Sequence, residues 1–126
     1  MLTCCFESTY TARTIAKCRK NDLAVVDTEG HEKAVREAVK RGVWVYGYLN
    51  IGVLEKQRPY YEKLEHLRLA KYEGWDGEYW IDPTAKEWQD HIISLAKQIK
   101  VTGAINLYLD NIYIITLRGK RGFINE

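Results

Sequence analysis

A strand, a helix and a second strand follow one another over residues 23–49, and this order constrains the fold more than any other feature. The run Leu23–Val26 lacks polar alternation, which is typical of a strand buried on both faces of a parallel sheet. Residues 31–41 carry their apolar side chains on one helical face, Gly42 ends that helix, and residues 43–49 form the next apolar strand. The short loops predict a βαβ unit with a right-handed crossover, and therefore an α/β fold.

Further segments extend this pattern. They are a strand at 2–6, a helix at 8–19, a helix that opens with the capping-box pattern Thr84-Ala85-Lys86-Glu87, and a strand at 104–109. Residues 55–80 read as a long, irregular, aromatic connection with a short helix near 59–69. Three or four parallel strands amount to about half of a (β/α) TIM barrel, which takes roughly 200–250 residues. We expect one incomplete domain over residues 1–126, with a poorly packed basic tail over residues 114–126.

Composition limits which kinds of protein this chain can be and which partners it can bind. The 126 residues are 46% hydrophobic, which favours a globular fold, and 19 basic against 17 acidic residues leave a net charge of only +2. So balanced a charge argues against nucleic-acid binding. No run approaches the ~20 apolar residues of a membrane span, and the first residues lack the pattern of a secretion signal, so the chain as given reads as cytoplasmic.

Cofactor motifs are absent from the sequence. There is no GxGxxG or Walker loop, the three histidines lack ligand spacing, and Cys4, Cys5 and Cys18 form no CxxC pair. We therefore expect no cofactor and no metal. For the three cysteines we expect free thiols, although one disulfide from Cys18 to Cys4 or Cys5 stays open.

Five carboxylates lie at or just beyond strand ends or in connecting loops: Asp27, Glu55, Glu78, Asp82 and Asp110. Catalytic groups of α/β barrels sit at the carboxyl ends of strands, and glycoside hydrolysis uses two carboxyls across a bound sugar. Asp110 is the best placed, although it could cap the following turn together with Asn111. Asp27 could equally contact a ligand or end its strand, and Asp82 could organise the start of the next helix. Glu78 follows Gly77 in what reads as a tight loop, where it could contact a sugar.

Aromatic and basic side chains surround these acids. Arg58 could clamp a hydroxyl-rich group or pair with a nearby glutamate. Six rings are candidates for stacking on sugars or for ordinary packing: Tyr48, Tyr60, Tyr61, Trp75, Tyr79 and Trp80.

Four motifs, in order over residues 21–113, resemble glycoside hydrolase family 114, the endo-α-1,4-polygalactosaminidase-like TIM-barrel proteins. They are Asn21-Asp22-Leu23-Ala24-Val25-Val26-Asp27, Tyr48-Leu49-Asn50-Ile51-Gly52 with Glu55 and Arg58-Pro59-Tyr60, Gly77-Glu78-Tyr79-Trp80-Ile81-Asp82 with Glu87-Trp88-Gln89, and Tyr108-Leu109-Asp110-Asn111. The resemblance covers about three quarters of the chain but only the N-terminal half of the family's barrel.

The resemblance implies hydrolysis within a polysaccharide of α-1,4-linked galactosamine units, with Asp110 as one of two essential carboxylates. It implies a substrate site shaped by Asp27, Tyr48, Glu55, Arg58, Glu78, Trp80, Asp82 and Asn111, an extracellular setting, and a second carboxylate on a later strand.

Two departures from the family pattern keep other functions open. Val53 stands where the family's loop has its first Glu, and Tyr113 stands where a second Asp often follows the Leu-Asp-Asn motif. One alternative is a carbohydrate-binding protein without catalysis. Another is a truncated, inactive half-barrel that must oligomerise, as a homodimer that completes a barrel, because an open half leaves an uncovered sheet edge.

Overall fold

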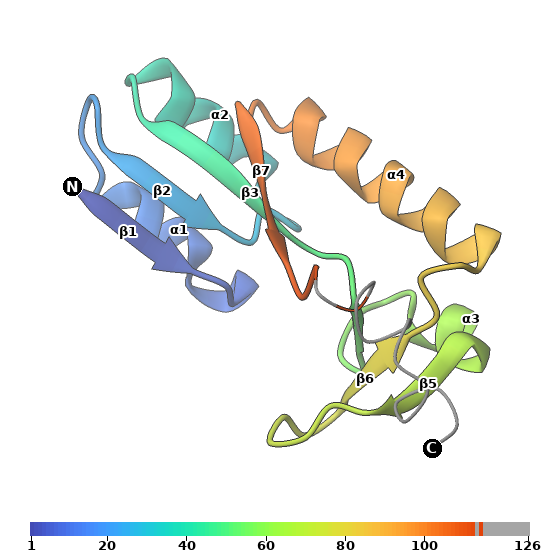
Figure 1. The fold of residues 1–126 in the computed structure, drawn as a ribbon. Helices are drawn as coiled ribbons and strands as arrows, with labels where there is room; N and C mark the ends of the chain where they lie inside the picture. The colour runs from blue at the N-terminus through green and yellow to red at the C-terminus, as the bar shows by residue number, and fades with distance from the viewer. Residues whose placement is uncertain (113, 115–126) are drawn as a thin grey trace. The chain divides into compact units, whose positions relative to one another are not determined.

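A computed structural model describes residues 1–112 and residue 114 (Figure 1). The chain divides into two compact units. The first unit comprises residues 1–49 and 94–108, and the second comprises residues 50–93 and the described residues from 109 onwards. The expected basic tail, apart from Ile114, and the departure at Tyr113 lie outside the described residues.

In the first unit strands alternate with helices, whereas in the second unit two short helices follow the first strand and precede the other two. The first unit holds β1 (Leu2–Cys5), the 3-10 helix η1 (Ser8–Tyr10), α1 (Thr11–Ala16), β2 (Leu23–Val26) and α2 (Glu32–Lys40). The second unit holds β4 (Val53–Glu55), α3 (Tyr61–Leu64), the 3-10 helix η2 (Glu65–Leu67), β5 (Arg68–Lys71) and β6 (Glu78–Ile81). Three elements have residues in both units: β3 (Trp44–Asn50), α4 (Lys86–Val101) and β7 (Asn106–Asp110).

The sheet of the first unit confirms the predicted α/β class. Its strand order is β1-β2-β3-β7, with β2 parallel to both β1 and β3. Leu23 lies opposite Leu2 on one side and Trp44 on the other. Helices α1 and α2 cover one face of these strands (Figure 1). The run Ala24–Val26 is almost fully buried, as expected of a central strand of a parallel sheet.

Glycines end the two long helices, and the sequence predicts the first of them, Gly42. Gly42 follows α2 with a φ of +91°, and Gly103 follows α4 with a φ of +98°, a backbone conformation that favours glycine. The predicted helix at 8–19 is shorter than expected, because only residues 8–16 have helical structure.

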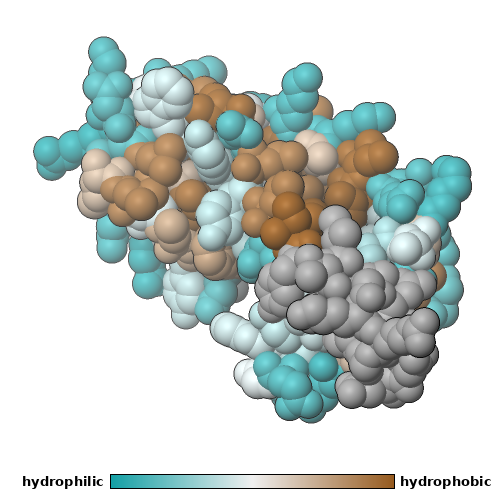
Figure 2. Space-filling model, in the orientation of Figure 1, coloured by the Kyte–Doolittle hydropathy of each residue, from teal (hydrophilic) through white to brown (hydrophobic). Residues whose placement is uncertain are grey.

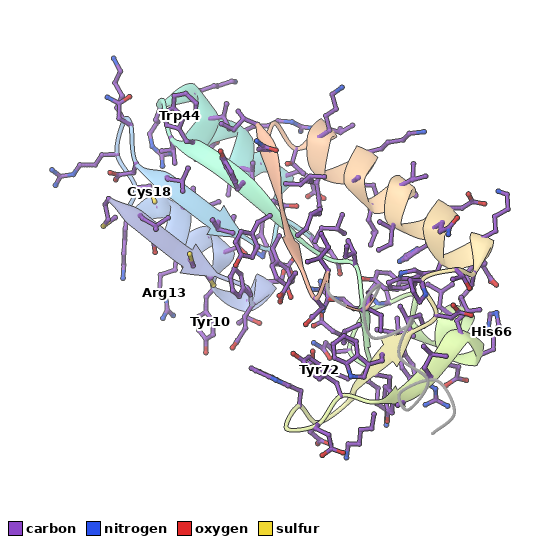
Figure 3. The ribbon with its side chains drawn as sticks, in the orientation of Figure 1. Tyr10, Arg13, Cys18, Trp44, His66 and Tyr72 are labelled. Carbon is purple, nitrogen blue, oxygen red and sulfur yellow. The ribbon has the colours of Figure 1, made fainter. Side chains whose placement is uncertain are left out.

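On the face of the sheet away from α1 and α2, several apolar side chains of the described residues are exposed. Along β3, Val45, Gly47 and Leu49 are buried, whereas the alternate residues are exposed or half-buried, and Trp44 is 52% exposed. Leu2, Phe6 and Tyr108 are exposed as well. Figure 2 shows apolar residues across this side of β1 and β3, and Figure 3 labels Trp44 at the start of β3.

The second unit contains a three-stranded antiparallel sheet, of order β4-β6-β5, where the sequence predicts only an irregular connection. The prediction over 55–80 was therefore wrong in this respect, although the short helix expected near 59–69 is present as α3 and η2. Five buried residues form its main core: Leu54, Tyr61, Leu64, Ile81 and Trp88. A second cluster joins Val53, Trp80 and Ile114.

The three cysteines are free thiols, as expected, and burial raises the pKa of the Cys18 thiol (Figure 3). Over the residues that the structure describes, no helix has both the length and the apolar character needed to cross a membrane.

Candidate functional site

Two glutamates face each other at the end of the antiparallel sheet. Glu55 is the last residue of β4 and Glu78 is the first residue of β6, and the two are paired in the antiparallel register. Directly opposite residues of such a pair have Cβ atoms about 5 Å apart on the same face. Glu78 is therefore part of a strand and not of the tight loop that the sequence suggested. Gly77, with a φ of +72°, makes the turn that precedes it.

Arg58 neutralises one member of this pair. Its guanidinium Nη2 donates to Glu55 Oε1 at 3.2 Å, and both side chains are almost buried. Gln57 Nε2 also donates to the Glu55 carboxylate, at 2.8 Å. Of the two interpretations of Arg58, pairing with a local glutamate is therefore the one present.

Glu78 has the opposite electrostatic environment. Burial raises the pKa of its carboxyl to about 7, and the negative charges of Glu55 and Asp110 add to the rise, against a smaller opposing effect of Arg58. The Glu78 carboxyl therefore keeps its proton up to near-neutral pH.

Asp110 is the last residue of β7, as predicted from the strand-end pattern. Its backbone carbonyl accepts from the Ile51 N–H at 3.2 Å, and its carboxylate Oδ1 accepts from the Asn111 N–H at 2.9 Å. The carboxylate therefore makes the turn contact that the alternative reading proposed. Its charge also raises the pKa of Glu78, so the two carboxyls belong to one electrostatic cluster.

Asn111 is a buried residue with a φ of +58°, a conformation that Asn adopts more readily than most residues. Its Nδ2 donates to Asn50 Oδ1 at 3.1 Å, and its Oδ1 accepts from the Tyr72 hydroxyl at 3.2 Å. Asn50 Oδ1 also accepts from the Val53 N–H at 3.0 Å. This network fixes the backbone that carries Asp110.

Sequence reasoning named neither Asn50 nor Tyr72 (Figure 3) as a site residue. The polar end of the Tyr48-Leu49-Asn50 strand was a signal for Asn50, whereas Tyr72 lies 39 residues from Asn111 and left no local pattern.

Two other expected site residues have structural contacts in the second unit. Asp82 Oδ1 accepts from both the Thr84 N–H, at 2.9 Å, and the Thr84 hydroxyl, at 2.7 Å, before α4 begins. Asp82 thus organises the approach to this helix. Trp80 is 6% exposed and packs against Tyr72 with ring centroids 4.6 Å apart. Sugar contacts by Asp82 and Trp80 stay predictions.

The remaining two, Asp27 and Tyr48, belong to the first unit. Asp27 is buried after β2, where its Oδ1 accepts from the Glu29 N–H at 3.2 Å and its carbonyl accepts from the Thr11 hydroxyl. The Tyr48 ring stacks on Phe6 at 4.7 Å between centroids, and Tyr108 joins the stack at 5.4 Å from Phe6. Their roles in binding stay predictions.

Possible metal ligands do not converge in the part of the chain that the structure describes: no three His, Cys, Asp or Glu side chains there form a group suited to a metal ion.

Comparison with solved structures shows the fold. Ega3 of Aspergillus fumigatus, in complex with galactosamine, matches with a TM-score of 0.72 and 13% identity, over 99% of this chain and 46% of that one. The glycoside hydrolase domain of PelA from Pseudomonas aeruginosa matches with a TM-score of 0.66 and 15% identity, over 87% of this chain and 43% of that one. An α-galactosidase of Thermus thermophilus, TtGalA, matches with a TM-score of 0.63 and 15% identity, over 90% of this chain and 31% of that one.

The predicted partial TIM-barrel fold is thus confirmed. The chain spans less than half the length of the solved glycoside hydrolases that it matches. Among curated proteins, none matches it in sequence.

Family membership rests on a separate comparison. The pattern of one glycoside-hydrolase family matches residues 4–115, which is most of the chain and includes every residue of the acid cluster. This chain belongs to glycoside-hydrolase family GH114.

Proposed function

We propose that this chain acts on a polysaccharide of α-1,4-linked galactosamine units and hydrolyses linkages within it, with Asp110 as an essential carboxylate. One observation carries the proposal. In a GH114 chain, the strand-end Asp110 shares an electrostatic cluster with Glu55, Glu78 and Arg58. Hydrolysis by paired carboxyls needs only water as a second reactant.

The charge of the cluster supports an amino-sugar substrate. Glu55, Glu78 and Asp110 share the cluster with the guanidinium of Arg58, so these acids outnumber that cation. A galactosamine unit with a free amine carries a positive charge, which such a site attracts, whereas an acetylated unit is neutral. Ega3, a structural neighbour, was solved in complex with galactosamine. Glu55, Arg58, Glu78 and Asn111 are the proposed contacts within the second unit.

Reducing-end release from α-1,4-linked galactosamine oligomers tests this function, with the purified 126-residue chain as the enzyme. We expect Asp110→Asn to lower turnover at least about a hundredfold, since it removes a charged group from the reacting centre, while oligomer binding is largely kept. Glu73→Gln, at an exposed glutamate of the same unit, is the matched control and should leave turnover unchanged. Full turnover by Asp110→Asn would exclude the proposed role.

A second candidate is a carbohydrate-binding protein without catalysis. The observation that favours it is Val53, which is buried against Trp80 and Ile114 where the family's loop has its first Glu. Oligomer binding by a folded chain that releases no reducing ends would select this candidate over the first.

Exposed apolar side chains on the sheet of the first unit indicate how a protein of either function could assemble. Sheets of parallel strands usually have both faces covered, yet Leu2, Trp44 and Tyr108 are exposed here. We propose that a second copy completes the barrel and in doing so covers these side chains. Light scattering should then give twice the mass of the 14.7 kDa chain. A stable, folded monomer would argue against it.

A further inference from the structure

His91, in the first half of α4, is a half-buried histidine that the acid cluster does not use. Its ring contacts two aromatic side chains of the second unit. The centroid of the imidazole lies 4.2 Å from that of the Tyr60 ring and 5.5 Å from that of the Trp88 ring. Its Nε2 atom is buried and has no hydrogen-bond partner among the described residues. Aromatic packing therefore holds this side chain in place.

Two effects oppose a positive charge on this ring. Burial lowers the pKa of His91 from its usual 6.5, and the positive charge of Lys63, in α3, lowers it further. A charged imidazole in this place would be partly withdrawn from water, beside another cation and without an acceptor for its Nε2 proton. The surroundings of His91 therefore fit the neutral ring and not the charged one.

The acidic side chains of α4 that precede His91 have cations of their own. Glu87, four residues earlier, pairs with His66 at 2.8 Å, and Asp90, one residue earlier, pairs with Lys86 at 2.7 Å. Both pairs are exposed, and neither carboxylate is among the causes of the shift in the pKa of His91. Over residues 1–112 and 114, no counter-charge is thus in place for a protonated His91 ring.

Trp88 connects His91 to the end of β7. The indole Nε1–H of Trp88 donates to the Ile51 carbonyl at 3.0 Å. The Ile51 N–H in turn donates to the carbonyl of Asp110 at 3.2 Å. A chain of hydrogen bonds therefore runs from an indole that His91 contacts to the backbone of the strand-end carboxylate.

Tyr60 connects His91 to the arginine of the acid cluster. It directly precedes Tyr61, the first residue of α3, whose N–H donates to the Arg58 carbonyl at 3.1 Å. The Arg58 N–H donates to the Glu55 carbonyl at 3.1 Å, and its guanidinium pairs with the Glu55 carboxylate at 3.2 Å. The packing of Tyr60 thus helps to fix the turn from which Arg58 reaches Glu55.

We propose that neutral His91 is a positioning residue for the acid cluster, and that a proton on its ring loosens the turns that carry Arg58 and Asp110. His91 acts through Tyr60 and Trp88, so it is not a catalytic residue. The expected effect on turnover rests on the proposed function, whereas the loosening itself does not. The second unit then contains a proton-sensitive contact that weakens the acid cluster at low pH.

The direction of the pH effect follows from the folded and unfolded states of the chain. In the unfolded chain His91 titrates near 6.5, and in the folded chain it titrates lower, so the unfolded chain binds more protons in between. The stability that neutral His91 contributes is fully present above pH 6.5 and is lost as pH falls through the lower, folded value. Glu78, whose pKa is raised, acts in the opposite direction over part of this range, so variants must be compared.

Amide hydrogen exchange tests the proposal without a substrate. NMR of the His91 imidazole first gives the pH at which the ring titrates, which we expect below 6.5. The protection factors of the Ile51 and Tyr61 amides are then measured one pH unit above and one below that midpoint. We expect both to fall by about threefold to tenfold on the acid side, because their hydrogen bonds open more readily. The Val43 amide of the first unit, bonded to the Ala38 carbonyl, should keep its protection.

Three variants assign the effect to His91. His91→Phe keeps an aromatic ring beside Tyr60 and Trp88 but takes up no proton, so it should abolish the acid loss of protection. Lys63→Gln, at an exposed position, removes the neighbouring cation, and both the midpoint of His91 and the onset of the loss should move to higher pH. His66→Gln is the matched control, since His66 is an exposed histidine of the same unit (Figure 3), and should leave both unchanged.

Two results would overturn the proposal directly. One is a His91 ring that titrates at 6.5 or above, and the other is an unchanged protection of the Ile51 and Tyr61 amides across its titration. If His91→Phe fails to fold, Lys63→Gln decides the matter. A loss of protection that does not move with the midpoint of His91 in that variant contradicts the role.

Turnover separates this role from the proposed function. In a chain that cleaves galactosamine oligomers, the acid limb of kcat should move to higher pH in Lys63→Gln and stay in place in His66→Gln. An acid limb that ignores Lys63→Gln contradicts only the role of His91. A chain that cleaves no oligomer, but whose amides lose protection as His91 titrates, contradicts only the proposed function.

Discussion

The two units of this chain differ in their buried side chains and in where they place their polar groups. In the first unit, β1, β2 and β3 pair in parallel around a core of short aliphatic residues, and the buried Asp27 and Thr28 organise a loop. In the second unit, β4, β6 and β5 pair antiparallel, and opposed glutamates stand at the end of the sheet. The first unit resembles a scaffold, whereas the second holds Glu78, the carboxyl whose pKa is raised to about 7.

This difference shows why family membership alone does not tell which unit holds the acid cluster. The family pattern covers both units. Glu78, whose pKa is raised, belongs to the second unit, as do its neighbours Glu55, Arg58 and Asp110. Mutations in the two units should therefore separate effects on stability from effects on function.

Core truncations should have the largest effects. Leu54 in the second unit and Val35 in the first are both fully buried. We expect Leu54→Ala to lower the free energy of unfolding by about 2–5 kcal/mol, and Val35→Ala by about 2 kcal/mol, because each leaves a cavity. Urea denaturation measures both. Leu54 adjoins Glu55, so its truncation should also weaken oligomer binding, whereas Val35→Ala should not. Equal loss of binding in the two variants would break the comparison between scaffold and site.

Glycine replacements should have intermediate effects. A Cβ at Gly47, in the first unit, would overlap the Ile99 side chain, and a Cβ at Gly52, in the second, would overlap the backbone carbonyl of Asn111. Both Ala variants should lose about 1–3 kcal/mol of stability. Gly52→Ala should be the costlier, because a backbone carbonyl cannot rotate away as a side chain can.

Turnover of galactosamine oligomers should also differ between Gly47→Ala and Gly52→Ala. Gly52→Ala displaces Asn111, next to Asp110, and should lower turnover of galactosamine oligomers, while Gly47→Ala keeps the turnover per folded molecule. A Gly52→Ala chain that is folded and fully active would show that Asp110 tolerates a shifted turn.

The pH dependence of stability should be the smallest effect. The folded-state pKa of Glu78 is raised from 4.5 to about 7, so the folded chain binds more protons than the unfolded chain between these values. The contribution of this group is fully present below pH 4.5 and is lost as pH rises through 7. Solvent screening at this half-buried group limits the loss to about 1 kcal/mol. Glu78→Gln should remove this slope, and Glu37→Gln, an exposed control in the first unit, should keep it.

Apolar patterns predicted the first unit well. The run Leu23–Val26 is a strand with the predicted bounds, and Gly42 follows α2 as predicted, since both features depend on local sequence. The position of Asp110 at a strand end followed from the same reasoning.

The antiparallel sheet escaped prediction because its strands have three or four residues and partly polar faces, which resemble a loop. The opposition of Glu55 and Glu78, 23 positions apart, depends on the register of that sheet. The pKa of Glu78 depends on burial and on Asp110, 32 positions away. Neither could follow from spacing along the chain.

Carboxyl-carbon NMR of the chain with labelled glutamate measures the protonation state of Glu78 directly. Glu78→Gln identifies the resonance by its disappearance. We predict that this resonance titrates near pH 7 and that the midpoint falls in Glu55→Gln. A Glu78 carboxyl that titrates near 4.5, with or without Glu55, would contradict the account.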